Sequence, residues 1–175
     1  MSKKAGVGQV FIFIVAALTF SLIMIFGYKV IVDFVGKGEQ VEFIQFKTDL
    51  ESSVKKIYTE FGSRRVRQYH LPVQFKQICF VDLDHQPTEE EQEALCNHDQ
   101  VACEMWDEAY VREDKQGYEA VDENVFLQPV PASGAQIKVY KISMDNHFLC
   151  ENISSGFFSL QLEGKGDRTE LSRAR

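Results

Sequence analysis

Four cysteines, Cys79, Cys96, Cys103 and Cys150, are the residues of this chain with the most defined chemistry. An even number of cysteines in an extracytoplasmic domain permits two disulfides, in three possible connectivities. Cys79 and Cys150 each lie in a strand-like run, whereas Cys96 and Cys103 are close together in one loop-like stretch. We therefore expect the pairs Cys79–Cys150 and Cys96–Cys103, the first joining distant strands and the second closing a local loop. The alternative is that all four cysteines are reduced, because the extracytoplasmic location of the domain is itself inferred.

Catalytic groups are hard to find. The chain contains no G-x-S-x-G, no H-E-x-x-H and no phosphate-binding glycine loop. The histidines occur singly, at His70, His85, His98 and His147. We therefore expect a protein that is not an enzyme and uses no cofactor.

Two groups of residues could bind a metal ion. Cys96, His98 and Cys103 could hold zinc together with His85, since zinc accepts thiolate and imidazole ligands. Acidic residues such as Asp82 and Asp84 could hold calcium, but no EF-hand spacing is present. A disulfide between Cys96 and Cys103 would use both sulfurs of the zinc group. For the acidic residues, a solvated surface is the simpler interpretation. We predict no metal site.

Charge is unevenly distributed along the 175 residues, which carry a formal net charge of -7. Residues 82–123 hold most of the acidic side chains, and Arg64, Arg65 and Arg67 form a basic cluster before them. A nucleic-acid partner is not expected, because it would need a basic stripe. In an assembly, the acidic insertion of one subunit could meet the basic cluster of the next. The favoured alternative is that the acidic insertion and the basic cluster neutralise each other within one domain, or that both are simply solvated.

One apolar segment dominates the N-terminal part. From Val10 to Tyr28 the chain has no charged residue. At about 1.5 Å per residue, a helix of this length just crosses a hydrocarbon core of roughly 30 Å. The segment is too long for a signal-peptide core and lacks an A-x-A-like cleavage site, so we expect it to be retained. Lys3 and Lys4 precede it, which predicts a single pass with the N-terminus in the cytoplasm and the C-terminal domain outside.

An amphipathic helix is expected after this segment. Apolar residues recur at helical spacing and on one face, namely Phe43, Phe46, Leu50, Val54, Ile57 and Phe61. The helix is expected to stop at Gly62, a residue type common just past a helix end. The apolar face should pack on the chain's own sheet, and a partner helix is the alternative.

The remainder is expected to be rich in strands. Thr88 and Glu91 form a capping-box pattern that predicts a short helix to about Leu95. Strand-like runs occupy 74–83, 124–130, 136–143, 147–150 and 157–163, and the last residues, 164–175, form an edge strand or a frayed end.

The predicted fold class is therefore α+β: a long N-terminal helix, transmembrane and then amphipathic, packed on a small antiparallel β-sheet or sandwich head. Its expected divisions are a short basic leader or cytoplasmic stub (1–9), a transmembrane helix (10–35), an amphipathic helix (36–63) and an extracytoplasmic β-rich domain (64–175) with an acidic insertion (82–123).

The N-terminal residues Lys3-Lys4-Ala5-Gly6-Val7-Gly8-Gln9, followed at once by the apolar helix, resemble the class III signal segment of type IV pilin-like proteins, especially archaeal ones. The resemblance covers about the first thirty residues. It implies cleavage at Gly8-Gln9, or after Ala5, and a mature helix that first anchors the subunit and then packs in a filament core. No basic residue directly precedes Gly8, and Phe13 stands where many pilins carry an acidic residue.

Two functions follow from this layout. The first is a pilin-like structural subunit of a cell-surface filament, in which the small residues Ala16, Ala17 and Ser21 let helices approach closely. The second is a single-pass, signal-anchored envelope protein whose β domain binds a ligand or a partner protein. The expected partners are the lipid bilayer and further copies or other envelope proteins. Asn152-Ile153-Ser154 is an N-glycosylation acceptor sequence, which fits an extracytoplasmic turn.

Overall fold

The computed structural model describes residues 5–111, 114–131, 134 and 136–174, except for the side chains of residues 5–9 and 32–37. The chain forms two compact units, Met1–Val41 and Glu42–Arg175. One helix, α1 (Ala5–Ile57), supplies nearly all of the first unit and continues into the second. A single helix thus contains both the predicted transmembrane and the predicted amphipathic segment.

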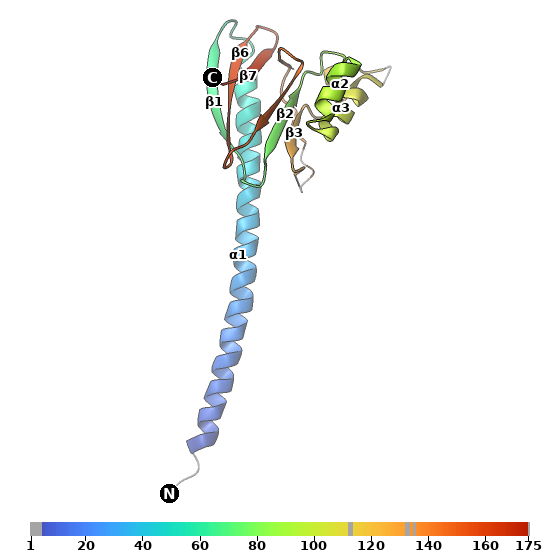
Figure 1. Cartoon of the computed structure of the whole chain (residues 1–175). Helices are drawn as coiled ribbons and strands as arrows, with labels where there is room; N and C mark the ends of the chain where they lie inside the picture. Colours follow the sequence, from blue (N-terminus) through green and yellow to red (C-terminus); the bar gives the residue numbers. More distant parts are fainter. Residues whose placement is uncertain (1–4, 112–113, 132–133, 135, 175) are drawn as a thin grey trace. The chain divides into compact units, whose positions relative to one another are not determined.

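The second unit, which we call the head, contains two small sheets and is α+β, as predicted (Figure 1). The four-stranded sheet has the order β1-β6-β7-β4, formed by β1 (Arg64–His70), β6 (Phe157–Gly164), β7 (Thr169–Arg173) and β4 (Ile142–Ser143). Its pairs are antiparallel except for β4 and β7, which run parallel. The three-stranded sheet has the order β3-β2-β5 and is antiparallel, formed by β3 (Val125–Gln128), β2 (Gln77–Val81) and β5 (Phe148–Asn152).

The amphipathic part of α1 packs on the head's own four-stranded sheet. Five of the six predicted face residues are at most 7% exposed, namely Phe43, Phe46, Leu50, Val54 and Ile57. They share one apolar core with Leu160, Leu162 and Leu171 of β6 and β7. A polar contact reinforces this packing, because the Thr169 hydroxyl donates to the Val54 carbonyl at 3.1 Å. Packing within the head is therefore the outcome, rather than packing on a partner helix.

The predicted end of this helix was wrong. α1 stops at Ile57, and Phe61 is 82% exposed in the turn that follows. Gly62 lies in that turn with φ +76°, and its N–H donates to the Gly164 carbonyl. The helix ends early because β6 crosses beside its last turn, and the chain must reverse to pair β1 with β6.

The acidic insertion is mainly helical. It contains α2 (Glu89–Cys96), α3 (Gln100–Val111) and the short 3-10 helix η1 (Gly117–Glu119). The predicted capping box is present at the start of α2. Trp106 of α3 is fully buried in a second apolar cluster that also contains Val81 of β2 and Phe126 of β3. This cluster holds the insertion against the three-stranded sheet, beside β2 and β3 in Figure 1.

Three strand predictions need correction. The run 136–143 contributes only Ile142–Ser143 as a strand, with Ile137 in an isolated bridge to Val125. Arg64–His70, a range for which no strand was expected, forms strand β1 at one edge of the sheet, with its arginines largely exposed. The final strand β7 lies between β6 and β4 rather than at an edge, because its buried Thr169 and Leu171 cover the helix.

Candidate functional site

The apolar segment of α1 is the first functional feature. A stretch of 22 residues, Val10–Ile31, is long and apolar enough to cross a membrane, and none of it is buried within the chain. The hydroxyl groups of Thr19 and Ser21 bond to the backbone of the same helix. Thr19 donates to the Val15 carbonyl at 3.0 Å, and Ser21 donates to the Ala17 carbonyl at 2.8 Å. Such back-bonding hides polar groups that a hydrocarbon environment would leave without partners.

The small residues predicted for helix contact lie on this exposed segment. Ala16, Ala17 and Ser21 are all solvent-exposed in α1. The predicted processing site precedes them. The backbone of Gly8 and Gln9 is helical, and their side chains lie outside the described residues.

Both predicted disulfides are present. Cys79 of β2 is bonded to Cys150 of β5, its direct partner in the sheet register. Cys96 at the end of α2 is bonded to Cys103 of α3, so the bond joins two helices, and the expected loop-like stretch was wrong. The second bond consumes both thiolates of the zinc group that the sequence offered as an alternative, so that group cannot form with the cysteines oxidised.

The basic cluster pairs within the head. Arg64 lies 2.6 Å from Glu163 of β6, and Arg65 lies 2.5 Å from Glu60. Neither carboxylate belongs to the acidic insertion. Contact between the insertion and the basic cluster of another subunit stays a prediction.

The two aspartates of the possible calcium group face different partners. The Asp84 carboxylate lies 3.3 Å from the Lys141 ammonium group. Asp82 is 3% exposed and accepts a hydrogen bond from the Asp84 N–H at 3.0 Å. Burial raises the pKa of the Asp82 carboxyl. Asn152, the predicted glycosylation residue, is exposed at the end of β5.

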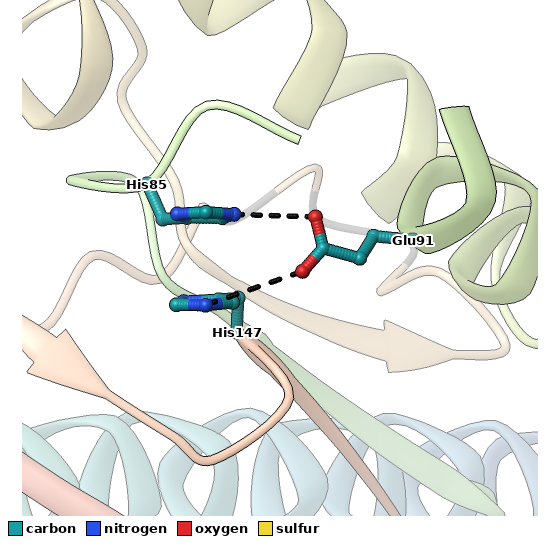
Figure 2. A group of neighbouring side chains, drawn as sticks. All are labelled: His85, Glu91 and His147. Carbon is teal, nitrogen blue, oxygen red and sulfur yellow. Dashed lines mark hydrogen bonds and ion pairs between the residues drawn. The ribbon is translucent and has the colours of Figure 1, made fainter. Parts of the chain in front are cut away.

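The head instead brings His147 together with His85 and Glu91, which are only six residues apart in sequence (Figure 2). His85 lies in the loop between β2 and α2, Glu91 in the first turn of α2, and His147 in the turn before β5. The two imidazole rings are stacked, with centroids 3.4 Å apart and an interplanar angle of 11°. We call these three residues the His-Glu-His cluster. This cluster was not expected from the sequence, because only Glu91 has a local signal, its capping-box position.

Hydrogen bonds from the helix cap fix the Glu91 carboxylate. The N–H and the hydroxyl of Thr88 each donate to Glu91 Oε2 at 2.9 Å, and His85 Nε2 lies 3.2 Å from the same oxygen. These bonds stabilise the ionised form, above all the backbone bond from Thr88, and lower the pKa of Glu91 to about 2. Glu91 is therefore an anion throughout the usual pH range.

The acid sensitivity of the head should depend on Glu91. The pKa of Glu91 is lowered on folding from its ordinary 4.5 to about 2. The unfolded chain therefore binds more protons between these values. The stabilisation is present above about pH 5 and is lost as the pH falls toward about 2. Glu91→Gln keeps an acceptor oxygen for Thr88 but does not titrate. We expect its free energy of unfolding, measured by denaturant titration, to fall less steeply over this pH interval than that of the parent.

The control is Glu90→Gln, an exposed change in the same turn of α2, which should keep the parent's pH profile. Equal slopes for Glu91→Gln and the parent would contradict the assignment.

Comparisons with protein-family models, with curated proteins and with solved structures find no match for this chain. The functional interpretation therefore rests on the residues and their geometry.

Proposed function

We propose that this chain is a non-enzymatic, membrane-anchored extracytoplasmic protein, and specifically a pilin-like structural subunit of a cell-surface filament. The observation that carries the proposal is the unburied apolar surface of Val10–Ile31. A contiguous apolar surface of this size needs a cover, either lipid or other protein. The head does not need this surface for its own core, because residues from Phe43 onward already cover its sheet.

The head supports an extracytoplasmic location. Its two disulfides account for all four cysteines, and such bonds persist in oxidising compartments. Lys3 and Lys4 before the apolar segment favour the same orientation. The resemblance of the leader to class III signal segments then favours filament assembly over simple anchoring.

A second candidate is a signal-anchored protein whose head binds a ligand or an envelope partner. It is favoured by a groove of about 760 Å³ on the head. The groove is lined by residues of β5, β6 and β7, among them Leu149, Gln161 and Arg173. Its volume is within the range of small-molecule sites, and its mainly polar and charged lining would suit a polar ligand or a polar partner surface.

Replacing both Ala16 and Ala17 by leucine should abolish filament assembly while leaving membrane insertion intact. The added bulk separates helices that must approach closely, whereas leucine favours insertion. The measurement is electron microscopy of sheared surface filaments, together with immunoblotting of the membrane fraction.

The matched control, Ala16→Ser with Ala17→Ser, keeps both side chains small and should assemble. Normal filaments from the leucine variant would refute helix packing through these residues.

Mass spectrometry of the mature N-terminus separates the two candidates. A start at Gln9 or Gly6 supports the pilin-like subunit, and a start at Met1 or Ser2 supports the anchored binder. A start beyond Tyr28 would refute both, since the apolar segment would then be a discarded signal peptide.

A further inference from the structure

We propose that the His-Glu-His cluster of the head binds one divalent transition-metal ion of the zinc class. One potential ligand atom from each of His85, Glu91 and His147 lies within 4.8 Å of the others. Around a tetrahedral ion with bonds of about 2.0–2.1 Å, ligand atoms are roughly 3.3 Å apart. The separation of His85 Nε2 from Glu91 Oε2 is 3.2 Å, and that of His147 Nε2 from Glu91 Oε1 is 4.0 Å. Because a metal ion lies in the plane of each imidazole that binds it, one of the two stacked rings must also rotate before both reach the same ion.

The elements that carry these residues hold them in place. The stacked rings present one nitrogen edge each to the same carboxylate, as Figure 2 shows. The carbonyl of His85 accepts a hydrogen bond from the Trp106 indole at 2.9 Å, which ties the loop to the buried face of α3. Glu91 is oriented by the capping box and needs no rearrangement to present Oε1.

His147 has a buried ring nitrogen, Nδ1, that faces a carboxylate while its Nε2 faces Glu91. Its Nδ1 is buried and has no hydrogen-bond partner among the described residues, while the Asp82 carboxylate lies 3.7 Å away. A metal on Nε2 places the imidazole proton on Nδ1, where a carboxylate can accept it. Such carboxylate–histidine–metal arrangements orient the ligand in many metal sites. Asp82, itself buried, is placed to be this outer partner.

The donor set defines the class of ion. Two imidazoles and one carboxylate suit zinc and related late transition metals, whereas calcium and magnesium take mainly oxygen ligands. The side chains of the three ligands are 25–34% exposed, so a further coordination position opens to solvent. Because His147 precedes β5 while Glu91 belongs to α2, a bound ion would join the helical insertion to the three-stranded sheet.

The test is isothermal titration of the chelator-treated, full-length chain in detergent with zinc chloride. We expect one ion per chain and no comparable binding of calcium or magnesium. Glu91→Gln preserves the cap but removes the anionic ligand. His147→Asn removes the imidazole and suits the positive φ of 61° at this position. Each should weaken zinc binding at least about tenfold, since even outer-partner changes cost about 10–100-fold.

The matched control is His98→Asn, an exposed histidine of the same insertion, which should bind zinc as the parent does. Thermal unfolding without metal shows whether a variant still folds, and zinc should raise the unfolding temperature of the parent and of His98→Asn more than that of the two ligand variants. If His147→Asn proves unstable, Glu91→Gln decides the question. No zinc binding by the parent, zinc affinity unchanged in Glu91→Gln, or binding that depends on His98 would overturn the proposal.

Discussion

Replacing both Cys79 and Cys150 by alanine is expected to lower the free energy of unfolding of the head by about 4 kcal/mol. The bond joins residues 71 positions apart, so its loss frees a long loop in the unfolded chain. The same treatment of Cys96 and Cys103, only 7 positions apart, should cost about 2 kcal/mol, because the loop-closure entropy grows with loop length. Denaturant titrations of the full chain in detergent give both values.

The variant that lacks Cys96 and Cys103 is the control, since it also removes one disulfide bond and two sulfur atoms. Equal losses would show that chain entropy is not the main contribution of these bonds.

A methyl group at Gly164 should destabilise the head by about 3 kcal/mol, at the upper end for overpacking. An added Cβ would lie 2.1 Å from the Ile57 carbonyl oxygen and 2.4 Å from that of Glu60. Backbone atoms cannot turn aside as a flexible side chain can. The strand is also held there, because the Gly164 N–H donates to the Ser63 carbonyl and its own carbonyl accepts from Gly62.

Gly38→Ala is the matched control, because a Cβ at this helical position meets nothing within 4 Å. It should be neutral or slightly stabilising, since alanine suits a helix interior better than glycine. Thermal or denaturant unfolding measures both variants. A Gly164→Ala protein as stable as the parent would contradict the close packing of β6 on the end of α1.

Two helical features were predictable from sequence, whereas α3 was not expected as a helix. The spacing from Phe43 to Ile57 identified the buried face of α1, because one helix face supplies much of the head's core. Thr88 and Glu91 identified the start of α2, because capping is a local interaction. Phe61 stands at the next helical spacing of this apolar face, but only by chance. The helix ends before it because β6 crosses there, which the sequence does not show.

One strand, β1, escaped prediction and another, β7, was expected only as one of two alternatives, for a common reason. In β1 only Tyr69 is buried, so an edge strand of mainly exposed side chains gives no alternating pattern. In β7 two buried residues, Thr169 and Leu171, are too few to distinguish a strand from a polar tail. The His-Glu-His cluster was hidden for a different reason: His85 and His147 meet only because β2 pairs with β5, a non-local contact.

The order of the strands has a consequence for the synthesis of the chain. The helix face from Phe43 to Ile57 is covered by β6 and β7, which end at Arg173. At about 5–20 residues per second, the ribosome needs on the order of ten seconds to reach these strands after completing the helix. During that interval the nascent chain presents a second apolar surface just beyond its apolar N-terminal segment. A chain interrupted before β6 would keep that surface uncovered and would be a natural substrate for chaperones and quality-control proteases.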